Sequence, residues 1–127
     1  MKMDATPLTD KQYRALARTV LDQIEAMVDS WLQNDVIDID ARRSGELLEL
    51  NFPNGSKLIL NTQPPLQELW LAARGGGFHF KYVSGRWLNA RDGKEFYDVL
   101  STCATEQSGK SLRFGRGGSE NTNAGQV

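Results

Sequence analysis

One stretch in the middle of the chain, residues 63–80 (QPPLQELWLAARGGGFHF), constrains the fold most strongly. It places Trp70 between two leucines and, after three glycines, His79 between two phenylalanines. Side chains of a β-strand point alternately to opposite faces. If the leucines and phenylalanines face a core, Trp70 and His79 face outward, and Gly75–Gly77 supply the turn between two strands. An outward tryptophan in mid-strand predicts a sheet face that another molecule contacts.

Similar alternation predicts further strands on both sides of this stretch. Residues 35–40 alternate isoleucine with aspartate, which predicts a half-buried strand at a sheet edge. Residues 46–52 and 57–61 each place apolar residues on one face, and they flank Asn54-Gly55, a strong hairpin signal. Residues 86–88 are predicted to form a short last strand. The pattern therefore predicts an antiparallel meander of about six strands.

Helices are expected at both ends of this meander. Thr9 and Gln12 have the spacing of a capping box, and apolar residues then recur every three or four positions to about Gln33. Asp92 is expected to cap a second helix, which Gly109 ends. The predicted fold is an α+β two-layer sandwich, helix–meander–helix, with both helices on one face of the sheet.

The length of 127 residues predicts one domain, over residues 1–114, followed by a disordered tail over 115–127 that is rich in glycine, serine and asparagine. One cysteine and one histidine exclude both an internal disulfide and a Cys/His zinc site within one chain. The absence of a signal-like or membrane-spanning apolar run, together with the single cysteine, predicts a cytoplasmic protein.

The charges are unevenly distributed, although the net charge is only −1. From Thr19 to Asp40 there are six acidic residues and no lysine or arginine. An acidic helix face is usually only a solvated surface. Carboxylate oxygens are nevertheless the ligands that hard or borderline cations such as Fe²⁺ accept, and an acidic ridge can also steer docking on a basic partner.

The order of several short motifs resembles the frataxin family in its bacterial form, the CyaY family. The resemblance covers residues 9–114, which is nearly the whole predicted domain. It is carried by the first helix, the acidic segment and the Asn-Gly hairpin, and then by these residues in order: Asn61-x-Gln63-x-Pro65, Trp70-Leu71-Ala72, Gly76-Gly77, His79-Phe80, Trp87 and Arg91-Asp92-Gly93.

The resemblance implies a role in iron–sulfur cluster assembly, with iron bound weakly by carboxylates of the first helix and first strand. Carried over by position, the candidate iron ligands are Glu25, Asp29, Asp38 and Asp40, with Asp22 and Asp35 nearby. This chain departs from the family where Ala26, Ser30 and Leu32 replace frequent carboxylates, and where Arg42 and Arg43 follow the acidic segment. The acidic ridge is therefore thinner than is usual for the family.

The resemblance also implies docking on the cysteine desulfurase and the iron–sulfur scaffold. The candidate partner-binding residues are Asn61, Gln63, Glu68 and Trp70. The family usually has glutamine where this chain has Glu68, and strand alternation puts this carboxylate on the same face as Trp70. No nucleic acid or membrane is expected as a partner, and the protein is expected to be a monomer in the absence of iron.

Two alternatives to this non-catalytic, iron-binding role remain. The first is a ferroxidase that oxidises Fe²⁺, although a di-iron centre of the helix-bundle type needs Glu-x-x-His motifs and the predicted helices contain no histidine. The second is a protein-interaction module whose metal binding is incidental. Saturable turnover of Fe²⁺ would distinguish the first alternative from the other two roles.

Overall fold

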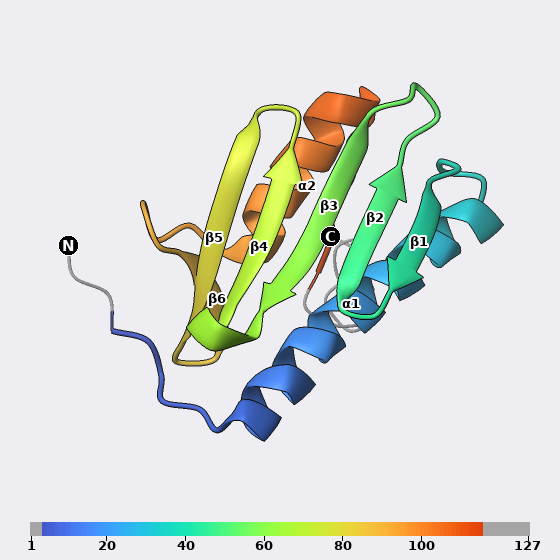
Figure 1. Cartoon of the computed structure of the whole chain (residues 1–127). Coiled ribbons are helices and arrows are strands. Elements are labelled where there is room, and N and C mark those ends of the chain that lie inside the picture. Colours follow the sequence, from blue (N-terminus) through green and yellow to red (C-terminus); the bar gives the residue numbers. More distant parts are fainter. Residues whose placement is uncertain (1–3, 116–127) are drawn as a thin grey trace.

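The computed structural model describes residues 4–115, and the predicted tail lies almost entirely outside this range. A single six-stranded sheet has its strands in chain order, each antiparallel to its neighbours. Helices α1 and α2 cover one face of this sheet and leave the other face open (Figure 1), which confirms the predicted α+β sandwich. The elements are α1 (Asp10–Gln33), β1 (Asp40–Ser44), β2 (Leu47–Asn51), β3 (Lys57–Gln63), the 3-10 turn η1 (Pro64–Leu66), β4 (Glu68–Ala73), β5 (Gly76–Val83), β6 (Arg86–Asn89) and α2 (Phe96–Ser108).

Helix α1 begins with the predicted capping box. The Thr9 hydroxyl accepts from the Gln12 backbone N–H at 3.0 Å, and the Gln12 side chain accepts from the Thr9 backbone N–H at 2.9 Å. These two bonds satisfy donors that the first helical turn would otherwise leave unpaired. The apolar stripe of the helix, which includes Leu21, is buried against the sheet.

The predicted edge strand over residues 35–40 is wrong in its position, because β1 begins only at Asp40. The chain leaves α1 through a tight turn in which Asp35 has a φ of 58° and the Val36 N–H donates to the Trp31 carbonyl at 2.8 Å. Ile39 is buried, so the alternation of residues 35–40 reflects the packing of apolar side chains against the core and not strand pairing. A ladder forms only further along, where residues 40–44 have β2 as a partner.

The central strands follow the predicted alternation. Leu69 and Leu71 of β4 are buried in the core between the layers, together with Leu58 and Leu60 of β3. Strand β3 continues two residues beyond the prediction because its end pairs with the start of β4. The turn before β5 consists of Arg74 and Gly75, so the predicted three-glycine turn is wrong: the second and third glycines already belong to β5.

Helix α2 begins later than predicted, and its N-cap is Glu95 rather than Asp92. The Asn89 N–H donates to the Lys94 carbonyl, and Leu88 forms a β-bridge with Glu95. These contacts hold residues 94–95 in extended conformation along the outer side of β6, so helical geometry starts only at Phe96. Gly109 ends the helix with a φ of 76°, as predicted.

After α2 the chain returns beneath the sheet. Leu112 and Phe114 are buried, the Phe114 N–H donates to the Ser101 hydroxyl at 2.9 Å, and the Phe114 ring packs on Trp31 of α1 at 4.8 Å between centroids. This segment therefore joins the two helices and completes the core. Across residues 4–115, neither helix has the length and apolar character required to cross a bilayer.

Candidate functional site

The open face of the sheet presents a row of side chains across its three central strands. Trp70 of β4 lies opposite Asn61 of β3 on one side and opposite His79 of β5 on the other. The Trp70 and His79 rings stack, with centroids 4.1 Å apart and planes 6° from parallel. Trp70 points away from the core, as predicted, but it is half-buried rather than fully exposed because His79 covers one face of its ring.

Glu68 holds the Trp70 ring from within the same strand. Its Oε1 accepts the indole Nε1–H at 2.8 Å and lies 3.9 Å from the His79 Nδ1. The Glu68 side chain is only 11% exposed, whereas that of His79 is 53% exposed. The carboxylate therefore fixes the indole orientation and puts a negative charge beside it. We define Glu68, Trp70 and His79 as the aromatic cluster.

The predicted site residues do not include His79, because a lone histidine on a surface more often has no function than a binding role. Strand alternation, which places His79 on the outward face, is the feature of the sequence that could have identified this residue. The sequence did not reveal that the β4–β5 register places His79 directly opposite Trp70. The predicted partner-binding residue Gln63 is also on this face, directly opposite Glu68. The open face therefore brings all four predicted partner-binding residues together.

Tyr13 of α1 supports this face from the buried side. Its hydroxyl donates to the Glu68 carbonyl at 2.6 Å and accepts from the Gln63 backbone N–H at 3.0 Å. Burial raises the pKa of Tyr13, against the smaller opposing effect of the Gln63 hydrogen bond. One phenol thus fixes the ends of β3 and β4 next to the aromatic cluster.

The acidic residues of α1 lie beside a strand arginine. Arg43 of β1 contacts Asp22 at 2.7 Å and Glu25 at 2.5 Å through the same nitrogen, and the Arg43 side chain is only 22% exposed. Arg43 lies on the same strand face as buried core residues because its partner in β2 is Leu48. These two carboxylates are therefore already paired with a cation.

The other four predicted iron ligands are spread over the edge of the molecule. Asp29 accepts from the Gln33 side chain at 3.0 Å, and Asp40 pairs with Arg42 at 2.8 Å. Asp35 and Asp38 lie in the connection between α1 and β1. Within residues 4–115, no three histidine, cysteine or acidic side chains form a group that could hold a metal ion. The structure therefore brings Asp22 and Glu25 together but does not gather all six.

Comparison with known proteins relates this arrangement to one family. The family model for the frataxin-like domain matches residues 6–110. The iron–sulfur cluster assembly protein CyaY of Cupriavidus taiwanensis is 48% identical over 85% of this chain and 97% of its own length. The protein of the same name from Burkholderia mallei is 44% identical over 84% of this chain and 98% of its own length.

A solved structure agrees with the sequence matches. Frataxin from Psychromonas ingrahamii superposes with a TM-score of 0.75 at 34% identity, over 85% of this chain and 99% of that one. The shared fold, the domain match and the identity over nearly the full length of these relatives lead to one conclusion: the chain belongs to the frataxin-like domain family, in its CyaY branch.

Proposed function

We propose that this chain serves iron–sulfur cluster assembly as a non-catalytic protein that docks on the assembly machinery and carries iron weakly. The names of relatives at 44% and 48% identity support the general role. The expected partners are the cysteine desulfurase and the scaffold on which clusters form. A cytoplasmic location belongs to the same proposal, since the relatives named for this role are bacterial.

The observation that carries the docking proposal is the position of Trp70 in the aromatic cluster. Aromatic residues held rigidly on a surface lose little conformational entropy on binding and are frequent anchors of protein interfaces. Trp70 is fixed by a ring stack and a hydrogen bond before any partner arrives. Glu68 already accepts the indole N–H of Trp70. A partner would therefore contact the face of the Trp70 ring and the negative charge beside it.

The chemistry of the acidic ridge, which is formed by the six acidic residues between Asp22 and Asp40, supports weak binding of iron as a cargo. Carboxylates of Asp22, Glu25, Asp29, Asp35, Asp38 and Asp40 are hard oxygen donors that suit Fe²⁺ and Fe³⁺. Any iron held by Asp22 or Glu25 competes with Arg43 for the same oxygens. Competition and exposure both keep affinity low, which suits a protein that passes its metal on.

The direct test is a cluster assembly reaction with purified cysteine desulfurase, scaffold, cysteine and Fe²⁺. Adding this protein is expected to change the initial rate of cluster formation, in one direction or the other, with saturation as the protein concentration rises. A rate independent of the protein would contradict the proposal. Oxygen uptake measured with Fe²⁺ and the protein alone tests the ferroxidase alternative, which requires saturable turnover.

A further inference from the structure

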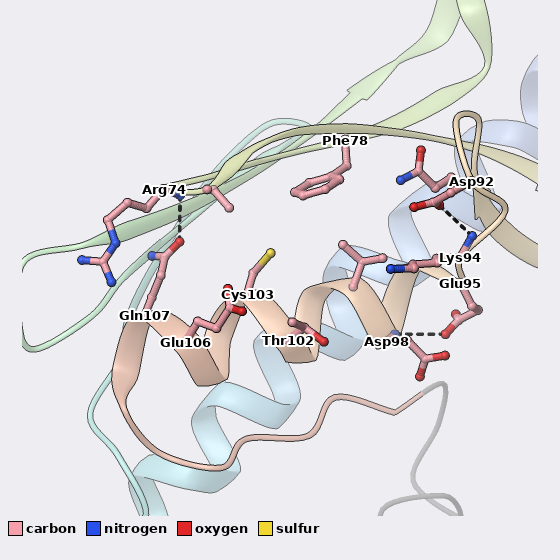
Figure 2. Close-up of a pocket in the computed structure, with 14 residues that line it drawn as sticks. Arg74, Phe78, Asp92, Lys94, Glu95, Asp98, Thr102, Cys103, Glu106 and Gln107 are labelled. Atoms are coloured by element: carbon pink, nitrogen blue, oxygen red, sulfur yellow. Dashed lines mark hydrogen bonds between the residues drawn. The ribbon is translucent and has the colours of Figure 1, made fainter.

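A cavity of about 720 Å³ lies between α2 and the sheet, at the end where strand β4 turns into β5. It lies on the opposite side of the sheet from the aromatic cluster, because its walls come from the helix-covered side of the sheet and from α2 (Figure 2). A volume of this size falls within the range of small-molecule sites in proteins, roughly 300–1,000 Å³. The chemistry of its lining indicates which ligands it can accept.

Apolar groups form the middle of the cavity. Figure 2 shows the Phe78 ring above it and the Cys103 side chain pointing up from α2, and Val99 lines it one helical turn earlier. Burial raises the pKa of the Cys103 thiol, with a smaller contribution from the charge of Glu106, so this thiol stays neutral at physiological pH. The space between Phe78 and α2 therefore suits a flat apolar group.

One end of the cavity offers hydrogen-bond donors and a positive charge. In Figure 2 the Lys94 side chain reaches into the cavity, and Lys94 forms no ion pair within residues 4–115. Asn89 also lines this end and is only 5% exposed. Its Oδ1 accepts from the Arg91 N–H at 3.0 Å, while its Nδ2 donates to no group in the described part of the chain. This amide nitrogen is therefore free to donate to a ligand in the cavity.

Acidic residues also line the cavity, and three of the four make contacts of their own. Asp92 accepts from the Lys94 backbone N–H, Glu95 caps α2 by accepting from the Asp98 N–H, and Asp98 pairs with Arg113 at 2.7 Å. Figure 2 shows the Glu95 and Asp98 carboxylates turned away from Phe78. Glu106 lines the cavity nearer its other end, beyond Cys103. Asp92 and Glu95 keep their charges at the Lys94 end, so a negative group is placed there only by direct contact with the Lys94 ammonium and the Asn89 amide.

We propose that this cavity binds a small molecule with a flat apolar body and an anionic head, such as an aromatic carboxylate or sulfonate. The body lies between Phe78 and α2, and the head accepts hydrogen bonds from Lys94 and Asn89. Charge-assisted hydrogen bonds of this kind are stronger than neutral ones, so the head contributes selectivity for anions. The inference does not depend on the role in cluster assembly.

Three fluorescent probes test the proposal with the full-length protein. Anilinonaphthalene sulfonate has the required body and head, N-phenylnaphthylamine has the same body without the sulfonate, and thioflavin T is a flat cation. The sulfonate probe is expected to bind saturably and about tenfold more tightly than the neutral probe, the factor that a charge-assisted hydrogen bond commonly supplies. Lys94→Gln should remove this difference and leave the neutral probe unaffected, whereas Lys110→Gln, outside the cavity, should preserve it.

Amide chemical shifts locate the bound probe. The largest changes are expected at Phe78, Asn89, Val99 and Cys103, and small ones at Trp70. Four results would overturn the proposal: no saturable binding of the sulfonate probe, equal affinity for the charged and neutral probes, tighter binding of thioflavin T, or shifts centred on the open face of the sheet.

Discussion

Removing one buried oxygen, by Tyr13→Phe, gives a sharp test of how the first helix supports the open face. The substitution keeps the ring, which is fully buried and packs edge-on against Trp87 at 6.1 Å. It removes the hydroxyl that joins the Glu68 carbonyl and the Gln63 N–H. Both backbone groups then lose a partner beneath the helix. The substitution therefore removes the two hydrogen bonds that the hydroxyl makes with the backbone.

The expected loss of stability follows from these two bonds. Leaving a buried polar group without its partner costs about 1–3 kcal/mol. The two losses are not independent, since one hydroxyl makes both bonds, so the expected total is about 2–4 kcal/mol. For a domain of this size, a loss of 1 kcal/mol lowers Tm by about 4 °C, which predicts a fall of roughly 8–16 °C. Urea and thermal unfolding of the two proteins measure this difference.

The pH dependence of this difference provides a second observable. The unfolded chain ionises Tyr13 near the ordinary tyrosine pKa of about 10, whereas burial raises the pKa in the folded protein. The stabilisation is therefore fully present below about pH 10, and it is lost as the pH rises from there through the folded pKa. The gap in unfolding free energy between wild type and Tyr13→Phe should narrow above this pH. A gap under about 0.5 kcal/mol at neutral pH, the size of ordinary surface substitutions, would refute the assigned bonds.

Further predictions concern the acidic ridge between Asp22 and Asp40. Arg43→Gln frees the carboxylates of Asp22 and Glu25, so Fe²⁺ or Mn²⁺ should bind several-fold more tightly by calorimetry; unchanged affinity would exclude these residues as ligands. Asp29→Lys removes an exposed acid from the C-terminal part of α1 and should raise stability by about 0.3–1 kcal/mol in urea unfolding. Asp22→Lys should lower stability because it replaces an ion pair with a repulsion beside Arg43, and equal shifts for the two lysine variants would contradict this geometry. In NMR spectra, Fe²⁺ should broaden amides of residues 22–40 and spare α2, whereas broadening centred on His79 would disprove the proposed ligands.

Much of the sheet could be predicted from the sequence because one of its faces is buried. A strand with one buried face must alternate, so the inward positions of Leu69 and Leu71 and the outward position of Trp70 followed directly. Alternation does not show where a ladder of hydrogen bonds begins. Residues 35–40 alternate in the way a strand would, but β1 and its pairing with β2 begin only at Asp40.

The start of α2 illustrates the same limit for helices. Asp92 and Glu95 have the spacing of a capping box, which is a local signal. In the structure Asp92 forms a turn in which it accepts from the Lys94 N–H, because β6 holds residues 94–95 in extended form. Tertiary contacts with a strand edge thus outweighed a local capping preference.

For the candidate site, the sequence predicted several of the residues but not the contacts between them. Asp22 and Glu25 share a helix face at a spacing that the sequence displays, whereas their pairing with Arg43 depends on how β1 lies against α1. Likewise, the stack of Trp70 on His79 depends on the register of β4 and β5. Cross-strand partners are set by turn geometry, which here involves two residues rather than three glycines.

The central claim, that Trp70 anchors the docking of the assembly machinery, is tested by the affinity of the purified cysteine desulfurase–scaffold complex for Trp70→Ala. Truncation of an interface anchor commonly costs about 2 kcal/mol or more, a loss of about thirtyfold in affinity. The variant also loses its ring stack and the bond to Glu68, so its folded fraction must be measured alongside. Leu71→Ala is the matched control: it should lose about 2–5 kcal/mol of stability and bind normally in its folded fraction. Affinity of folded Trp70→Ala equal to that of the wild type would contradict the account.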